Sequence, residues 1–352
     1  MKILIWSVLI LLSNYRPALP GYTFHFPRDH GNHPEYKLEW WYYTGHLDSA
    51  EGAEFGYELT FFRTGMEKKH ANASLWSIDD LYPAHFAISD LTGARFHFFE
   101  KLNRQGPGIA GAREGALDVW NQNWFARMEG NVIRLGAAAD SIRLQLRLTS
   151  NKRPVVHGRG GVSRKSENGA SHYYSLTRLA TEGTLFYQGR TLEVRGESWM
   201  DHEFGSQQLG PRQVGWDWFS LQLDQGEELM VFQIRRRDGT IDPFSAATVI
   251  SSSGEAMALA VKDFSLRPGR GWGSSRTGAR YPVEWTIHIP RLEAELQVSA
   301  LLDDQELLTF RSSGIAYWEG AIGVLGRWRG KRVQGRGYLE MTGYAKNSRP
   351  NI

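Results

Sequence analysis

The chain has 352 residues, of which 41% are hydrophobic and 22% are charged, a composition typical of folded globular proteins that can bury sizeable cores. Its 41 Lys and Arg residues against 38 Asp and Glu leave a formal charge of +3, and the basic residues are scattered, which argues against nucleic acid as a partner. The absence of cysteine excludes disulfides and thiolate nucleophiles, so only histidines and carboxylates remain as candidate metal ligands.

Residues 1–21 have the pattern of a secretory signal peptide. Lys2 is followed by an apolar run from Ile3 to Leu12 and by a polar break before Pro17. The run is too short for a membrane-spanning helix. No clear small-residue cleavage site follows, so a misassigned start or a buried strand are the alternatives. We expect a signal peptide and therefore a periplasmic or secreted mature chain.

From Glu39 onward, short apolar or alternating segments are separated by Gly, Asp, Asn and Pro, which indicates an all-β protein. The strands we expect, in chain order, are Trp40–Leu47, Phe55–Arg63, Tyr82–Ser89, Ile142–Thr149, Gly215–Leu223, Leu229–Arg236, Val283–Ile289, Ala294–Leu302 and Gln334–Thr342. Helix is expected only as a turn or two around Asn72–Leu81, and the glycine-rich stretches Gly106–Gly115 and Gly158–Gly169 are expected to be loops.

The chain repeats itself in two places. The hairpin that starts at Trp40 and ends with GYELTFFR aligns with the hairpin that starts at Trp216 and ends with ELMVFQIR. RGESWMD, Arg195 to Asp201, aligns without gaps on RGYLEMT, Arg336 to Thr342. Because two matches occur in the same order, we expect two β domains related by duplication, residues 22–210 and 211–352, each a barrel or a sandwich.

Several motifs are missing or uninformative. The sequence contains no GxSxG elbow, no HExxH motif and no phosphate loop, so serine hydrolase, zincin and nucleotide chemistry have no support. His25, His30 and His33 lie near Asp29, but their spacing fits no zinc pattern, and we expect a loop with satisfied polar side chains and no metal site. Glu39 and Glu319 lie in aromatic strands, where a paired structural carboxylate is the usual explanation.

Aromatic residues occupy both faces of two expected strands. Alternation places Trp41 and Tyr43 on one face and Trp40 and Tyr42 on the other, so that one pair lines a barrel interior and the other packs outward. By the same argument Trp216 and Trp218 share one face. Core packing and pocket lining are equally good interpretations of these residues.

The segment Glu197–Leu209 combines acids, a histidine and tryptophan in a way that favours a site. Residues two apart on a strand share a face, so His172 and Tyr174 lie together, as do Trp199 and Asp201. If the two strands are neighbours, all four side chains can converge. An acid kept protonated by aromatic walls, with a histidine to hold water, suits acid catalysis at an alkene. An ordinary structural ion-pair network remains the alternative.

The stretch Phe26 to Leu47, together with ESWMDHEFGSQQL, GWDWFSLQLDQGEELM, YPVEW, YWEGA and GYLEMTGY, resembles the AttH and carotenoid 1,2-hydratase family. The resemblance covers nearly everything after the leader and implies two lipocalin-like antiparallel β-barrel domains. In the hydratases it implies an acid that protonates an isolated double bond, followed by capture of the cation by water, without a cofactor.

The site pattern of those hydratases resembles His-x-Trp followed by Tyr-x-Asp, with 29 residues from His to Asp, as from His172 to Asp201 here. Tyr174 stands where the pattern has tryptophan, and Trp199 stands where it has tyrosine. The aromatic character that stabilises a cation is retained, but the substrate differs in shape.

The leading hypothesis is a cofactor-free hydratase-like lyase for an isoprenoid or lipid-like substrate. Asp201 would be the general acid and His172 the base that orients water. The residues expected to bind substrate are Tyr174, Trp199, Trp216, Trp218, Trp41 and His202. A non-catalytic carrier of an apolar ligand is the rival, and a secreted hydrolase or carbohydrate binder is a third alternative. Peripheral membrane contact and the oligomeric state are left open.

Overall fold

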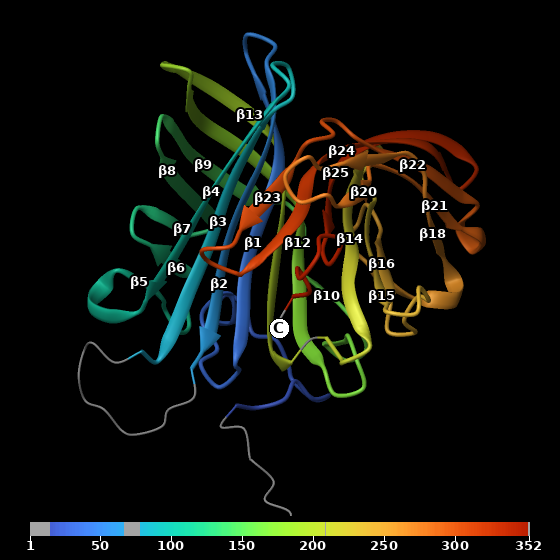
Figure 1. The fold of residues 1–352 in the computed structure, drawn as a ribbon, viewed down its shortest axis with the longest axis horizontal. Coiled ribbons are helices and arrows are strands. Elements are labelled where there is room, and N and C mark those ends of the chain that lie inside the picture. Colours follow the sequence, from blue (N-terminus) through green and yellow to red (C-terminus); the bar gives the residue numbers. More distant parts are fainter. Residues whose placement is uncertain (1–14, 67–77, 208, 351–352) are drawn as a thin grey trace, which may run out of the picture.

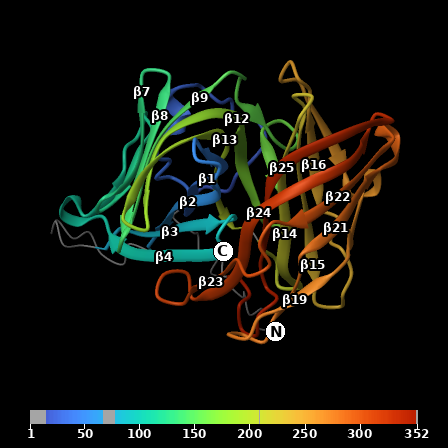
Figure 2. The same cartoon turned by 90° about the horizontal axis from the view of Figure 1, so that it is seen from above.

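The computed structural model describes residues 15–66, 78–207 and 209–350, which form two antiparallel β-barrels side by side (Figures 1 and 2). The fold class is therefore as predicted, two lipocalin-like barrels related by duplication. The described helices are short 3₁₀ turns, η1 (Arg28–His30), η2 (Gly106–Gly108), η3 (Val261–Asp263) and η4 (Pro290–Leu292). None of the helices in the described ranges is long and apolar enough to cross a membrane. The predicted leader lies largely outside the described residues.

The first sheet has 13 strands and curls around its own core. Its strands are β1 (Leu38–Ser49), β2 (Glu54–Gly65), β3 (Asp80–Asp90), β4 (Arg95–Arg104), β5 (Ala110–Ala112), β6 (Asp118–Asn121), β7 (Trp124–Glu129), β8 (Val132–Ala139), β9 (Ile142–Ser150), β10 (Val155–Val156), β11 (Val162–Arg164), β12 (Ala170–Tyr187) and β13 (Arg190–Gln207).

The second sheet has 10 strands around a separate core. Its strands are β14 (Gln213–Leu223), β15 (Glu228–Arg236), β16 (Ala246–Ile250), β17 (Ala256–Ala260), β18 (Ser265–Pro268), β21 (Glu284–Ile289), β22 (Ala294–Ala300), β23 (Glu306–Thr309), β24 (Ile315–Trp328) and β25 (Lys331–Met341). A separate two-stranded sheet is formed by β19 (Gly271–Gly273) and β20 (Arg280–Pro282).

All nine strands predicted from the sequence are present, with bounds that differ by a few residues. The two stretches predicted as loops are partly wrong, because β5 and η2 lie within the first and β11 within the second, where Val162 pairs with His172 of β12. Of the predicted helical turn, residues 72–77 lie outside the described ranges. Its last two residues begin strand β3 instead, where Leu81 pairs with Thr64 of β2.

Duplication is visible in the order of the strands. The first sheet contains the path β4-β3-β2-β1-β13-β12-β9-β8-β7, and the second contains β17-β16-β15-β14-β25-β24-β22-β21-β18. The two paths correspond strand for strand, and each closes its hairpin with the same turn, since Gly52 donates to Ser49 O and Gly226 donates to Leu223 O.

When the two hairpins are superposed on this shared turn, Ser49 corresponds to Leu223. The alignment made from the sequence is therefore wrong by two residues, and Tyr42, not Trp40, corresponds to Trp216. Tyr42 pairs with Asp201, and Thr342 donates its backbone N–H to Trp216 O. Thr342 therefore corresponds to Asp201, as the gapless match of the last strands predicted. The second barrel thus has no acid at the equivalent position.

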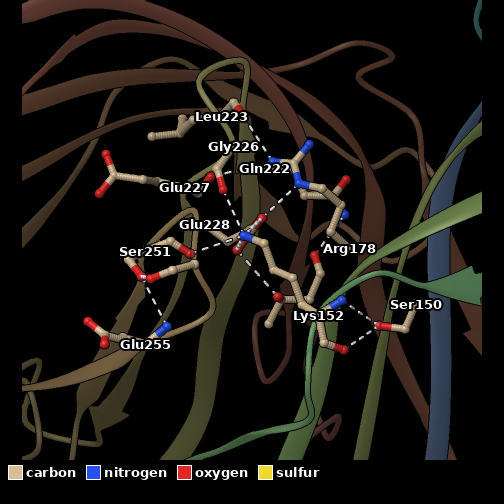
Figure 3. Close-up of polar contacts among 12 residues, drawn as sticks. Ser150, Lys152, Arg178, Gln222, Leu223, Gly226, Glu227, Glu228, Ser251 and Glu255 are labelled. Atoms are coloured by element: carbon tan, nitrogen blue, oxygen red, sulfur yellow. Dashed lines mark hydrogen bonds and ion pairs between the residues drawn. The ribbon is translucent and has the colours of Figure 1, made fainter.

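The barrels meet along an aromatic interface, where β1 contacts β25, β2 contacts β24 and β12 contacts β14. Figure 3 shows Lys152 and Arg178 of the first barrel reaching Glu228 of the second from two sides. Lys152 Nζ lies 2.7 Å from each oxygen of that fully buried carboxylate. The ion pairs fix the position of one barrel against the other, and this position shapes the space between them.

Candidate active site between the two barrels

Asp201 lies in the middle of β13 and points away from the first barrel's interior, toward the second barrel. Its ladder partners are Ser175 on β12 and Tyr42 on β1. Trp199 Nε1 donates to Asp201 Oδ1 at 2.6 Å, the Ser175 hydroxyl also donates to Oδ1, and the Tyr173 hydroxyl donates to Oδ2 at 2.6 Å. The aspartate is only 4% exposed.

Two further side chains hold these donors in place. Trp218 Nε1, from the second barrel, donates to the Tyr173 hydroxyl at 3.2 Å. His157 Nε2 lies 2.7 Å from Ser175 Oγ, and His157 Nδ1 lies 2.9 Å from Thr248 Oγ1 of the second barrel. Burial lowers the pKa of His157 to about 3, so the ring is neutral. Since Ser175 donates to Asp201, we assign the His157 proton to Nε2.

The environment of Asp201 makes it a proton donor near neutral pH. Burial raises the pKa of Asp201 to about 7, and the hydrogen bonds from Ser175, Tyr173 and Trp199 only partly oppose this effect. A carboxyl group of this kind, in a cavity, is what acid catalysis at neutral pH requires.

Asp201 opens onto a cavity of about 310 Å³ between the barrels. Its walls are largely aromatic and apolar, with Trp40, Phe62, Trp216, Trp218 and Phe232 among the residues that line it. Three glutamates, Glu203, Glu319 and Glu340, also line the cavity. The space therefore suits an apolar ligand that carries a few polar groups.

The structure brings together only part of the predicted site. Asp201, Trp216 and Trp218 line the cavity, and Trp199 lies behind Asp201 as one of its hydrogen-bond donors. The strands of His172 and Asp201 are neighbours, which is the condition that the sequence argument set for convergence. Three residues of the site were not predicted. Tyr173 and Ser175 donate directly to Asp201, and His157 contacts Ser175.

The expected convergence of His172 and Tyr174 on Asp201 is wrong. In the β12–β13 ladder His172 faces Phe204 and Tyr174 faces His202, whereas Ser175 faces Asp201. Neighbouring residues of a strand point to opposite sides, so His172 and Tyr174 lie on the other face of the sheet. There the His172 ring stacks on Tyr22, with centroids 4.4 Å apart. His172 is therefore not placed to orient water at Asp201.

Trp41 and His202, also predicted to bind substrate, lie with Tyr174 on the inner side of the first barrel. The Trp41 ring stacks on His202 at 4.9 Å, and Trp41 Nε1 donates to His30 O. His202 contacts the Tyr174 hydroxyl through Nδ1 and Glu39 through Nε2. These residues form a buried polar network away from the cavity.

This network includes a group with the composition of a metal site. Ligand atoms of His33, Glu39 and His202 lie within 4.8 Å of one another, a set that the sequence did not suggest. However, Arg63 already pairs with Glu39 Oε2 at 3.3 Å. Burial lowers the pKa of His33, but Glu39 and Asp29 outweigh this and raise it to about 9, so the ring is protonated beside Glu39. In the structure these side chains are therefore paired with one another and with Arg63.

Comparison with known proteins shows the family. A sequence model described as AttH-like matches residues 17–344. The solved structure of an AttH protein from Nitrosomonas europaea is 36% identical, has a TM-score of 0.85 and covers 94% of this chain and 100% of that chain. The chain therefore belongs to the AttH-like family.

Two more distant relatives carry names that refer to enzymes. The protein named Dehydratase asqC, from Emericella nidulans, is 22% identical over 276 residues, which is 75% of this chain and 77% of that protein. The structure of kievitone hydratase from Nectria haematococca has a TM-score of 0.72 at 18% identity and covers 95% of this chain and 98% of that chain.

Proposed function

We propose that this AttH-like protein is a hydro-lyase of the hydratase or dehydratase type, which adds water to or removes it from a hydrophobic substrate. The observation that carries the proposal is Asp201, a buried acid with a pKa of about 7 that opens onto an aromatic cavity. The names of the two distant relatives, a dehydratase and a hydratase, support the same reaction class. An isoprenoid or lipid-like substrate fits the largely apolar walls.

In the hydration direction, Asp201 gives its proton to one carbon of a C=C bond and becomes a carboxylate. The oxygen of a water molecule bonds to the other carbon, and one proton of that water is removed. The faces of Trp216, Trp218 and Phe232 stabilise the positive charge that develops. Dehydration follows the same steps in reverse.

A base is needed in place of His172, which lies on the other face of the sheet. Glu340 lines the same cavity, and burial raises its pKa to about 7, although Trp216 Nε1 donates to it at 3.0 Å. As a carboxylate, Glu340 accepts the proton from water. The proton taken up by Glu340 then returns to Asp201 through solvent, so the cycle closes with the alkene and water as the only reactants.

The test is to incubate the purified protein with a lipid extract of its source cells in water enriched in heavy oxygen, followed by mass spectrometry. We expect heavy oxygen in an alcohol, and its loss in Asp201→Asn. Asp48→Asn, at an exposed position, is the control. Heavy oxygen in a carboxylic acid would indicate hydrolysis instead.

The second candidate is a non-catalytic carrier of an apolar ligand, favoured by the largely apolar lining of the cavity. A carrier retains an unchanged ligand, incorporates no heavy oxygen and responds to Asp201→Asn only in affinity. That result would replace the hydro-lyase proposal.

We also propose that the protein acts in the periplasm or outside the cell, on the basis of its first 21 residues. Cell fractionation followed by N-terminal sequencing tests this. Intact residues 1–21 on protein from the cytoplasm would contradict it.

A further inference from the structure

Beside Asp201, the cavity wall contains buried polar atoms without well-formed partners. The Tyr42 hydroxyl, Thr60 Oγ1 and Glu319 Oε1 make no hydrogen bond of good geometry among the described residues, although Tyr42 lies within reach of Glu319 and Thr60 within reach of Glu58. Tyr42, Thr60 and Glu319 all line the cavity. They are 7%, 1% and 3% exposed, respectively. Leaving a buried polar group unpaired is costly, so such groups call for a partner that the chain itself does not supply.

The two barrels supply these atoms together. Tyr42 and Thr60 are partners in the β1–β2 ladder, and Glu58 lies two residues along β2 on the same face. Glu319 comes from β24 of the second barrel, where it pairs with Glu340 of β25. Both oxygens of Glu58, which is 1% exposed, are also unpaired. We call Tyr42, Glu58, Thr60 and Glu319 the acceptor cluster.

The cluster offers acceptors rather than donors. Ionised carboxylates only accept hydrogen bonds, and the two hydroxyls can accept as well. Among the described residues that line the cavity, four carboxylates face a single Lys or Arg side chain, Lys165. Lys165 is already paired with Glu203 at 3.4 Å. Among the described residues, the wall therefore has more carboxyl groups than cationic side chains to pair with them.

The cavity already accommodates one ammonium group against aromatic rings. Lys165 Nζ lies 4.3 Å from the centroid of Phe232 and 4.9 Å from that of Tyr173. Carboxylates combined with ring faces are the usual means by which proteins bind amines. The acceptor cluster likewise combines carboxyl groups with aromatic rings, since Tyr42 lies against Trp218 with ring centroids 5.3 Å apart.

The protonation of the cluster agrees with this assignment. Burial and the neighbouring Glu340 raise the pKa of Glu58 to about 8, and burial together with Glu58 and Glu340 raises the pKa of Glu319 well above its ordinary value. Without a cation, these carboxyls hold protons near neutral pH. A cation that binds among them favours the ionised form, so binding releases protons.

We propose that the acceptor cluster binds the primary ammonium group of an amphipathic substrate, whose apolar part lies along the aromatic wall beside Asp201. This inference deepens the proposed function by naming the head group of the molecule that enters the same cavity. It rests on the proposed function only in taking that molecule to be the substrate. The unpaired oxygens of Tyr42, Thr60 and Glu319 are the atoms that accept from the ammonium group.

The test uses three probes with the same chain and different head groups: octylamine, octanol and octanoate. Titration calorimetry of the full chain at neutral pH should show octylamine binding at least about tenfold more tightly than octanol, as expected for hydrogen bonds to charged groups, and octanoate binding weakest. Repeating the octylamine titration in buffers of different ionisation enthalpy should reveal proton release.

Two variants locate the head group. Glu319→Gln should weaken octylamine binding about tenfold and leave octanol binding unchanged, because only the charged contact is lost. Tyr42→Phe should also weaken octylamine binding without changing octanol binding, but by less than tenfold. This variant replaces Glu319→Gln in the test if Glu319→Gln does not fold. Glu193→Gln, at an exposed position of β13, is the matched control and should bind all three probes as the parent does.

Octanol binding as tightly as octylamine would overturn the inference, as would an equal loss of both probes in Glu319→Gln or no binding of any probe. These outcomes are separate from the test of the hydro-lyase. Amine preference without incorporation of heavy oxygen would leave the ammonium site standing and refute the lyase, whereas turnover without amine preference would do the opposite.

Discussion

Trp218 of the second barrel donates a hydrogen bond of 3.2 Å to the hydroxyl of Tyr173 in the first, and that hydroxyl donates to Asp201. A residue of one barrel thereby orients a donor to the candidate acid of the other. Because the barrels are held together by buried ion pairs and hydrogen bonds, the geometry of the site depends on the interface as much as on either barrel alone.

Asp201 should make stability depend on pH. The pKa of Asp201 in the folded protein, about 7, lies above the ordinary value of 3.8. The stabilisation that this shift contributes to the free energy of unfolding is therefore fully present below the ordinary pKa and is lost as pH rises through about 7. Asp201→Asn removes this loss, so the free energy of unfolding should fall less from about pH 5 to about pH 8 than in the parent. Urea unfolding at both pH values measures it. Parallel pH profiles for parent and variant would refute the raised pKa.

His172→Asn tests the placement of His172 outside the cavity. The variant should bind octylamine as the parent does, because the ring lies on the face opposite Asp201. Loss of the stacking on Tyr22 should lower the free energy of unfolding by about 1–2 kcal/mol. Calorimetric titration and urea unfolding check the two parts. A loss of affinity as large as that of Glu319→Gln would return His172 to the site.

Lys152→Met should destabilise the interface between the barrels. It leaves the fully buried Glu228 with only one of its two cationic partners, Arg178, at a cost of about 3 kcal/mol. The matched control is Asp48→Asn, which breaks the exposed pair between Asp48 and Arg336 across the same interface and should cost less than about 1 kcal/mol. Urea unfolding compares them, and equal costs would show that the Lys152 pair contributes no more than a surface pair.

Gly56→Ala should also destabilise the interface, by steric overlap. An added Cβ would lie 2.8 Å from the Cβ of Ala321 and 2.8 Å from the hydroxyl oxygen of Tyr338, both in the second barrel. Such overpacking costs about 1–3 kcal/mol. Gly273→Ala, with nothing within 4 Å of the added Cβ, should change stability by less than about 0.5 kcal/mol. Thermal unfolding of both variants is the measurement. A Gly56→Ala protein as stable as the parent would mean that the barrels can separate slightly at this point.

The sequence by itself determined the class of fold and its duplication. Alternation of apolar and polar residues has a period of two in strands, so it identified the strands and showed that Trp41 and Tyr43 share one face while Trp40 and Tyr42 share the other. The same argument placed Trp216 and Trp218 on one face, and both pack in the interface between the barrels. Asp201 could be singled out because an acid among tryptophans is rare in an ordinary strand.

Only the tertiary structure decided which side chains meet at the site. A period of two shows which residues of a strand lie together, but not the register against the next strand, and a shift of one residue exchanges Tyr173 and Ser175 for His172 and Tyr174. The contacts of Trp218 with Tyr173 and of His157 with Thr248 join two barrels. No local pattern specifies how two closed sheets pack, because that position follows from complementary surfaces and from buried ion pairs such as Lys152 with Glu228.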